Sequence, residues 1–400
     1  MLKELSKEFY QNKRQQLYDL LPDQSVTVIC AGSEVSKSLD ENYPFYVNNN
    51  YLYLTGLTEP DGILALVKKN GQNTTSLFIR KPDPFKEKWF GRYITIEAAH
   101  EKSGIDDIRY LEDFESFCSS LKELSYYEDD TLPDHQKRKF GFEHQHSLLP
   151  LLSEMRLVKS NEELALMRHA IHLTHLGINQ ILANLKPGDY EYQAQDIFEY
   201  TILNHGAEET AFDTIAVSGE DAPILHYMTN RKKMADATMV LFDLGARYHG
   251  YCADISRTFP VNGHYTKDQR ALYEAVLKAQ HEIISYYQAG TNMKDVQEKS
   301  RELLNQYGLA TGLFDPRKTI DDYYYHGIGH SLGLDTHDLC EDRNVTLKPG
   351  MVITCEPGLY MADRGMGVRI EDDILITENG PVVLSEEIPK SVDVIESMMQ

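Results

Sequence analysis

The chain has 400 residues, of which 42% are hydrophobic and 26% are charged, and its formal net charge is -22 at pH 7. The length is sufficient for two domains or more, and the composition is that of an ordinary globular protein with ample core material. Because the charge is strongly negative, nucleic acid and anionic membrane surfaces are poor partners for this protein.

Targeting and redox signals point to the cytoplasm. No apolar run is long enough to span a bilayer, and the opening MLKELSKEFYQNKRQQL lacks the apolar core of a signal peptide. The five cysteines are widely spaced and form no C-x-x-C pair, which argues against a disulfide framework and against a cysteine zinc site. We therefore expect a reduced, cytoplasmic protein.

The first part of the chain predicts an α/β domain over residues 1–150. Apolar residues at helical spacing predict a helix over 2–21, ended by Pro22. Short apolar runs bounded by Gly, Pro or Asn predict strands at VTVICAG, YLYLTGL, GILALVKK and TSLFIRK. Helical patterns return near 95–103 and 112–125.

A second domain is predicted over residues 157–400. Ser160 and Glu163 form a capping-box pattern, which opens a helix that should end near Leu185, before the Lys-Pro-Gly sequence. Further long helices are predicted around 190–205, 267–288 and 293–307. They alternate with the predicted strands MVLFDLG, GYCADISRTF, MVITCEPGLY and DDILITE.

Four acidic residues interrupt apolar segments that should be strands: Asp243, Asp254, Glu356 and Glu371. The tight RYHG segment after the first strand allows an antiparallel pairing that could bring the two aspartates together. Buried carboxylates repel one another strongly unless cations neutralise them. Two divalent ions would balance the four negative charges, with His330 adding a neutral nitrogen, so the pattern predicts a dinuclear metal centre.

The segment HGIGHSLGLDTHD, from 326 to 338, places three histidines in a glycine-rich loop. Its spacing G-x-G-x-x-x-G differs from that of a dinucleotide-binding loop, and no βαβ context is evident, so we reject that interpretation. The other histidines that we considered have no metal-like context and are predicted to be surface or packing residues: 144, 146, 169, 172, 175 and 205.

Together, LFDLGARYHGYCADISRTF, HGIGHSLGLDTHD, ITCEPGLY and GVRIEDDILIT resemble the pita-bread metallopeptidases, which include methionine aminopeptidase, prolidase and aminopeptidase P. The resemblance implies the metal ligands Asp243, Asp254, His330, Glu356 and Glu371. It further implies that Asp254 and Glu371 bridge two ions, that Asp243 completes one, and that His330 and Glu356 complete the other.

The same resemblance implies roles for further residues. His226 should face the substrate, His337 should hold the scissile carbonyl and stabilise the tetrahedral intermediate, and His326 should line the proline side. Arg369 is similar to the arginine that braces a metal carboxylate. Arg343 matches a substrate-end arginine of aminopeptidase P, with a different local spacing.

A carboxylate-rich ligand set without thiolate suits hard ions, so we expect Mn²⁺, with Co²⁺, Fe²⁺ or Zn²⁺ as possible substitutes. Such ions lower the pKa of a water molecule held between them. Glu356 is then expected to relay a proton to the leaving nitrogen, and His226 and His337 to stabilise the oxyanion.

The segments DENYPFYVNNNYLYLTGLTEPDG and KWFGRYITIEAA look like the creatinase-type N-terminal domain shared by prolidase and aminopeptidase P. The ending LSEEIPKSVDVIESMMQ is similar to aminopeptidase P endings. We therefore expect a creatinase-like α/β domain followed by a pita-bread catalytic domain, α/β (α+β) overall.

The expected activity is that of an Xaa-Pro aminopeptidase acting on peptides with proline second, as a homodimer or homotetramer. An Xaa-Pro dipeptidase with the same metal chemistry is the alternative. The complete ligand set speaks against a metal-free creatinase-like hydrolase and against a pure binding module.

Overall fold

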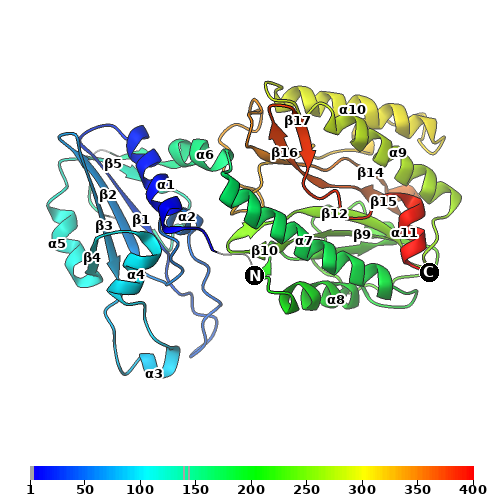
Figure 1. The fold of residues 1–400 in the computed structure, drawn as a ribbon. Helices are drawn as coiled ribbons and strands as arrows, with labels where there is room; N and C mark the ends of the chain where they lie inside the picture. The colour runs from blue at the N-terminus through cyan, green and yellow to red at the C-terminus, as the bar shows by residue number, and fades with distance from the viewer. Residues whose placement is uncertain (1–3, 138–139, 143–144) are drawn as a thin grey trace. The chain divides into compact units, whose positions relative to one another are not determined.

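The computed structural model describes residues 4–137, 140–142 and 145–400, and Figure 1 shows its elements. The chain forms two compact units, which divide between Arg156 and Leu157. No helix in the described part of the chain is both long and apolar enough to cross a membrane. All five cysteines are free thiols.

The N-terminal unit is built on one six-stranded mixed sheet in the order β4-β3-β2-β1-β5-β6. The strands are β1 (Ser25–Cys30), β2 (Ile63–Lys69), β3 (Gln72–Ile79), β4 (Asp107–Tyr110), β5 (Ser125–Glu128) and β6 (Gln145–Ser147). The helices are α1 (Lys7–Leu20), α2 (Asn49–Thr55), α3 (Glu87–Phe90), α4 (Ile96–Ser103), α5 (Phe114–Ser119) and α6 (Leu149–Leu157). Residue Leu2, at the start of the predicted first helix, lies outside the described residues.

The prediction of a strand at YLYLTGL is wrong, because this stretch forms helix α2. The side chain of Asn48 accepts hydrogen bonds from the backbone N–H groups of Asn50 and Tyr51, at 2.8 and 3.0 Å, and so begins a helix. Gly56, with φ at 74°, ends it in the left-handed conformation. The aromatic residues that favour a strand are outweighed by these two caps and by packing against α1. The helix predicted over 112–125 is also shorter in the structure, where α5 ends at Ser119.

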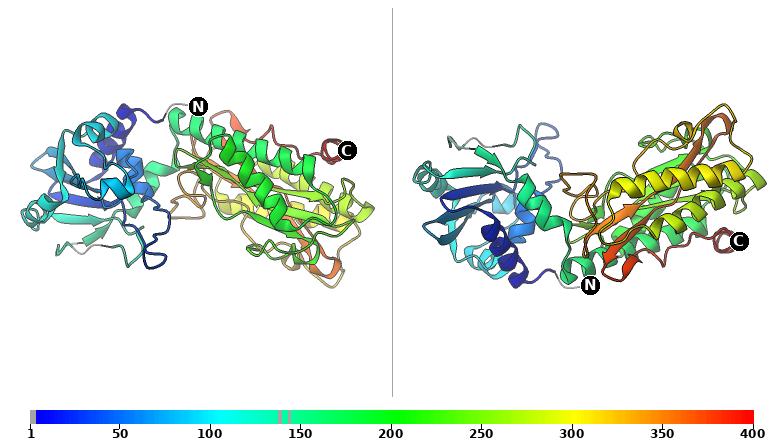
Figure 2. Two further views of the ribbon diagram at one scale, coloured as in Figure 1. Left: turned by 90° about the horizontal axis from the view of Figure 1, so that it is seen from below. Right: turned by 90° about the horizontal axis from the view of Figure 1, so that it is seen from above.

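The C-terminal unit places several small antiparallel sheets between two pairs of helices. Its helices are α7 (Asn161–Asn184), α8 (Glu191–Asn204), α9 (Lys267–Ile284), α10 (Met293–Ala310) and α11 (Val392–Met398). Its strands are β7 (Glu209–Thr210), β8 (Ile215–Ser218), β9 (Met239–Leu244), β10 (Ala246–Tyr248), β11 (Tyr251–Cys252), β12 (Ile255–Pro260), β13 (Val352–Cys355), β14 (Gly358–Met361), β15 (Met366–Arg369), β16 (Asp372–Thr377) and β17 (Gly380–Val383). Helices α7 and α8 cover one side of these strands and α9 and α10 the other, as Figures 1 and 2 show.

Two predicted local features of this unit are confirmed. The capping box at the start of α7 is present, because Ser160 and Glu163 each accept a hydrogen bond from the other's backbone N–H. The RYHG segment is a two-residue hairpin turn, in which His249 and Gly250 have φ values of 46° and 81°. Positive φ at both turn positions is typical of a type I′ turn, which matches the twist of an antiparallel pair.

Candidate active site

Backbone pairing brings the predicted acidic residues to one place. Strands β9 and β12 pair antiparallel with Asp243 opposite Ser256, and Asp254 immediately precedes β12. Glu371 lies between β15 and β16, and its N–H donates to the carbonyl of Ser256 at 3.0 Å. Glu356 follows β13, and its N–H donates to the carbonyl of Ile328 in the histidine loop.

His330 is held against the same strands by its own backbone. Its N–H donates to Oγ1 of Thr354 at 3.1 Å, and its carbonyl accepts from the N–H of Thr354 at 2.9 Å. On the imidazole, Nδ1 lies 3.1 Å from the carbonyl of Ser331. This contact turns Nε2 toward the carboxylates, which is the arrangement expected of a metal-ligating histidine.

The distances within the site are short. Ligand atoms of Asp254, His330 and Glu371 all lie within 4.8 Å of one another. The Nε2 atom of His330 lies 3.3 Å from Oδ2 of Asp254 and 3.6 Å from Oε1 of Glu356. The hydroxyl of Ser256 lies 3.0 Å from Oδ1 of Asp243 and 2.8 Å from Oε2 of Glu371, which links the remaining carboxylate to the group.

The electrostatics of this cluster fit bound cations. Burial, followed by the negative charges of Glu371 and Asp243, raises the pKa of Asp254 well above its usual value. Burial and the charge of Glu371 raise the pKa of Glu356 in the same way. Burial, followed by the charge of Asp243, raises the pKa of Glu371 to about 7. Carboxylates that resist ionisation together, with an imidazole among them, form a donor set suited to hard divalent ions.

Arg369, predicted to brace a metal carboxylate, donates hydrogen bonds to three groups of the site. Its Nη2 donates to Oδ2 of Asp243 at 2.6 Å, and its Nε donates to the hydroxyl of Ser256 at 2.6 Å. Its Nη1 donates to the hydroxyl of Tyr360 at 3.2 Å. The guanidinium therefore orients one predicted ligand directly and Glu371 through the serine.

Tyr360 and Asp373 lie at the site and were not among its predicted residues. The hydroxyl of Tyr360 lies 2.9 Å from Nε2 of His326, so this tyrosine connects the histidine to Arg369. Asp373 is fully buried, and its Oδ1 has no hydrogen-bond partner among the described residues. Its neighbour Asp372 is instead paired with Arg257 and Lys390. The only sequence signal for either residue was its place inside a motif that had been singled out for other residues.

The predicted substrate-side residues differ in how closely they approach the cluster. The ring centroid of His337 lies 4.1 Å from that of His330, and Nδ1 of His326 lies 3.6 Å from Oε2 of Glu356. His226 and Arg343 are exposed. Partial desolvation, followed by the charge of His330, lowers the pKa of His337 to about 4, and burial lowers the pKa of His326 to about 3. Both rings are therefore neutral near pH 7.

One glycine of the histidine loop is required by close packing. A Cβ atom at Gly329 would lie 1.9 Å from the carbonyl oxygen of Thr354, whereas a Cβ atom at Gly327 would meet nothing within 4 Å. A side chain at Gly329 would push His330 away from the strand that fixes it.

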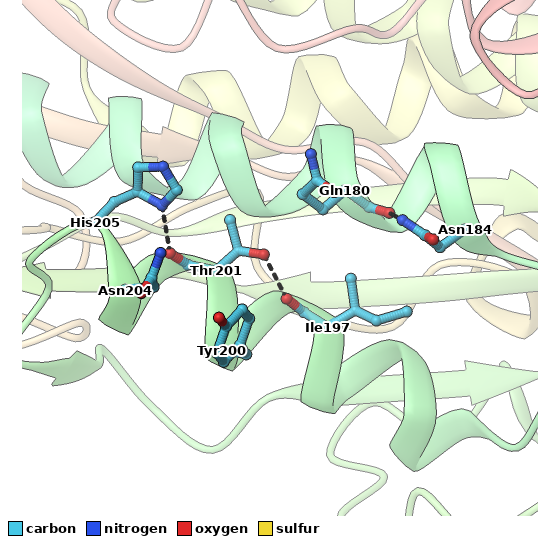
Figure 3. A pocket seen from close by; sticks show the side chains of 7 residues that line it. All are labelled: Gln180, Asn184, Ile197, Tyr200, Thr201, Asn204 and His205. Carbon is cyan, nitrogen blue, oxygen red and sulfur yellow. Dashed lines mark hydrogen bonds between the residues drawn. The ribbon is translucent and has the colours of Figure 1, made fainter.

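A separate pocket of about 330 Å³ lies between α7 and α8 and is lined by Gln180, Asn184, Ile197, Tyr200, Thr201, Asn204 and His205 (Figure 3). Its lining contains no carboxylate and no predicted site residue. Thr201 donates to the carbonyl of Ile197 and His205 contacts the carbonyl of Thr201, so these polar groups are engaged within their own helix. The pocket is not a candidate for the metal chemistry.

Three histidines predicted to be surface or packing residues form a row along α7. The ring centroids of His169 and His172 are 6.3 Å apart, and those of His172 and His175 are 6.2 Å apart. His172 also lies 3.2 Å from a carboxylate oxygen of Glu387. Among the residues that the structure describes, however, only Asp254, His330 and Glu371 bring three ligand atoms together.

Comparisons with known proteins agree with this geometry. Residues 165–378 match Metallopeptidase family M24, and residues 10–127 match the aminopeptidase P N-terminal domain. The Xaa-Pro aminopeptidase of Escherichia coli (strain K12) is 34% identical over 100% of this chain and 99% of its own length. The Xaa-Pro aminopeptidase of Haemophilus influenzae is 32% identical over 99% of this chain and 98% of its own length.

Solved structures show the same relationship. The chain superposes on aminopeptidase P from E. coli with the inhibitor Pro-Leu at a TM-score of 0.92, with 34% identity over 99% of both chains. A zinc-substituted E. coli aminopeptidase P in complex with product is also similar, with a TM-score of 0.92 and 33% identity over 99% of both chains. These matches confirm the predicted family resemblance and the predicted pairing of an N-terminal α/β domain with a pita-bread domain. The chain therefore belongs to metallopeptidase family M24, as a metallo-aminopeptidase of the aminopeptidase P type.

Proposed function

We propose that this protein hydrolyses the first peptide bond of peptides with proline in the second position and releases the N-terminal residue. The observation that carries the proposal is the convergence of four carboxylates and one imidazole in a unit of the M24 family. The N-terminal unit of the aminopeptidase P type supports this substrate class. An Xaa-Pro dipeptidase is the second candidate, since it would use the same metal chemistry.

We infer that the site holds two divalent ions, with Mn²⁺ as the physiological metal. Asp254 and Glu371 would bridge them, Asp243 would complete one, and His330 and Glu356 would complete the other. The absence of thiolate and the predominance of carboxylate oxygens favour Mn²⁺, with Co²⁺, Fe²⁺ and Zn²⁺ as substitutes. When bound, the ions would supply Lewis acidity to the scissile carbonyl and to the attacking water.

The protein's own residues then bind, orient and transfer protons. Glu356 lies between His330 and His326, where it would accept a proton from the attacking water and return it to the leaving nitrogen. His337 and His226 would donate hydrogen bonds to the developing oxyanion. Because lowered pKa values keep His337 and His326 neutral, each has one N–H donor whose direction is set by its neighbours.

The remaining substrate contacts follow from the same geometry. His326, whose ring packs edge-on against that of Tyr360, would line the pocket for the proline ring. Arg343, exposed near His337, would contact the far end of the peptide.

Self-association and location are further parts of the proposal. Three aromatic side chains on and beside α3 are strongly exposed, at 70% for Phe85, 72% for Trp89 and 78% for Phe90. Clustered exposed aromatic residues are typical of association surfaces, so they support a homodimer or homotetramer. The five free cysteines support a cytoplasmic location.

The proposed activity is tested with three matched peptides, X-Pro-Y, X-Pro and X-Ala-Y, and protein reconstituted with Mn²⁺. We expect release of X from X-Pro-Y, slow turnover of X-Pro and no turnover of X-Ala-Y. The Glu356→Ala variant controls for a contaminating peptidase. Preference for X-Pro would instead identify a dipeptidase, and turnover of X-Ala-Y at the same rate would contradict proline specificity.

A further inference from the structure

The segment that carries His226 has little regular structure of its own. It runs from Ser218, the last residue of β8, to Lys232. After Ser218, its only regular element is the short 3-10 helix η2 (Gly219–Asp221). Ile224 and Met228, two residues before and after His226, are 50% and 55% exposed. A segment without ladder hydrogen bonds and with exposed apolar residues keeps a side chain in place only through contacts with other elements.

One buried carboxylate binds both ends of this segment. Glu191, the first residue of α8, is fully buried. Its Oε1 accepts from the N–H and the hydroxyl of Ser218, both at 2.8 Å. Its Oε2 accepts from the N–H of Lys232 at 2.9 Å and from the hydroxyl of Tyr227 at 3.0 Å. The carboxylate therefore closes the segment into a loop and also anchors the residue next to His226.

A second residue of α8 adds to this attachment one turn later. The side-chain oxygen of Gln195 accepts from Nδ2 of Asn230 at 2.9 Å. Asn230 is buried and has φ at 47°, and its side chain also bonds to the backbone of Thr214 and Ala216 in and before β8. Residues four apart on a helix share one face, so Glu191 and Gln195 contact the segment together.

The other side of the segment is attached to the histidine loop. The hydroxyl of Tyr325 donates to the carbonyl of Pro223 at 2.5 Å, and Tyr325 directly precedes His326. The His226 segment is thus fixed between helix α8 and the loop that carries the predicted proline-side histidine.

We propose that Glu191 is a positioning residue that acts on hydrolysis by holding the His226 segment in place. The inference rests on the proposed function for the role of His226, and it adds a residue that does not touch the substrate. An ionised carboxylate is an acceptor only, and here each of its oxygens receives two donors. Replacing Glu191 by glutamine keeps the shape of the side chain but turns an NH₂ group toward one pair of donors. The hydrogen bonds that hold one end of the segment are then lost.

The first test is hydrogen exchange, measured by mass spectrometry on the full chain without added metal. The Glu191→Gln variant should exchange the amides of 219–231 at least about tenfold faster than the wild type. The matched control is Glu163→Gln, since Glu163 is also buried in the first turn of a helix and accepts from Tyr251 and Ser160. The control should leave exchange in 219–231 unchanged. Equal protection in wild type and Glu191→Gln would overturn the proposal.

The second test is a double-mutant cycle on kcat/KM for X-Pro-Y. We expect His226→Ala to lower kcat/KM by about 10²–10³-fold, as for loss of an oxyanion donor. Glu191→Gln should lower kcat/KM by about tenfold or more, mainly through kcat, because a misplaced donor stabilises the transition state less. In the His226→Ala background, Glu191→Gln should cause less than about threefold further loss.

The outcomes of this cycle separate positioning from general structural support. For the control Glu163→Gln, we expect the effect on kcat/KM to be additive with that of His226→Ala. Full additivity of Glu191→Gln with His226→Ala would overturn the positioning role of Glu191, even if hydrogen exchange increased. Failure of the wild type to hydrolyse any proline peptide would refute the proposed function. The exchange measurement would still decide whether Glu191 holds the segment.

Discussion

The Nη2 atom of Arg369 lies 2.6 Å from Oδ2 of Asp243, and this contact is the direct link between a predicted metal ligand and a permanently charged side chain. The same guanidinium reaches Ser256 and Tyr360 and is almost fully buried. It therefore holds the ligand carboxylate, the serine that contacts Glu371 and the tyrosine that contacts His326 in one arrangement.

Replacing Arg369 by lysine should lower the affinity for Mn²⁺ by about 10–100-fold. Lysine keeps the positive charge but cannot donate to three differently placed acceptors, because its ammonium group is a single point on a flexible stem. Mn²⁺ titration of peptidase activity measures the loss, with circular dichroism as the control for folding. An unchanged Mn²⁺ dependence would contradict the bracing role.

Replacing Tyr360 by phenylalanine should lower kcat/KM for proline peptides by about tenfold while the metal content stays the same. The change removes the hydroxyl between His326 and Arg369 and leaves a buried donor unsatisfied, at a cost of about 1–3 kcal/mol. The matched control is Tyr273→Phe, which removes a buried hydroxyl that donates to the carbonyl of Lys390. Equal kinetic effects of the two variants would show that the contact with His326 is unimportant.

A pair of glycine variants tests the packing of the histidine loop. Gly329→Ala should destabilise the protein by about 1–3 kcal/mol or more and weaken metal binding, because the new methyl group would overlap the Thr354 carbonyl. Gly327→Ala should be close to neutral, since nothing lies within 4 Å of its Cβ position. Urea unfolding and Mn²⁺ binding measure both effects. Similar behaviour of the two variants would mean that Gly329 is not required for close packing.

Removal of metal should make the stability contributed by Glu371 fall as the pH rises through about 7. Glu371 has a pKa raised to about 7 in the folded chain, against about 4.3 when unfolded, so the folded state binds more protons between these values. Stability contributed by the protonated acid is therefore lost as the pH rises through 7. His326 and His337 have lowered pKa values in the folded chain, against about 6.5 when unfolded, so they give an opposing slope that fades above about pH 7. Because metal-free and Mn²⁺-loaded protein share these two histidines, comparing the two forms isolates the contribution of the carboxylates.

The measurement is the melting temperature of metal-free and Mn²⁺-loaded protein between pH 6.5 and 8. The stabilisation by Mn²⁺ should increase with pH, since the metal competes with protons for the same carboxylates. An equal Mn²⁺ effect at both ends of this range would contradict the proposed ligand set.

Much of the catalytic unit was predictable because its signals are local. Acidic residues inside apolar runs of the sequence are unusual enough to mark Asp243 and Asp254, and the His-Gly turn between them allowed the hairpin to be anticipated. The capping box is likewise a local signal, because it needs only Ser160 and Glu163, three residues apart.

The missed features depend on contacts between distant segments. Nothing near Tyr360 in the sequence indicates that its hydroxyl meets His326, and Glu191 reads as an ordinary acid in the first turn of a helix. In YLYLTGL, aromatic residues favour a strand, but the cap from Asn48 and burial against α1 decide for a helix. Long-range burial and hydrogen bonding are absent from a local pattern, so these residues become evident only in the folded chain.

The count of bound metal ions tests the central claim most directly. Protein equilibrated with Mn²⁺ and then dialysed should hold two ions per chain by elemental mass spectrometry. Asp243→Ala should hold about one ion, and Glu371→Ala, which removes a predicted bridge, should lose both. A folded wild-type protein that holds one ion or none, or a Glu371→Ala variant that keeps two, would contradict the dinuclear centre.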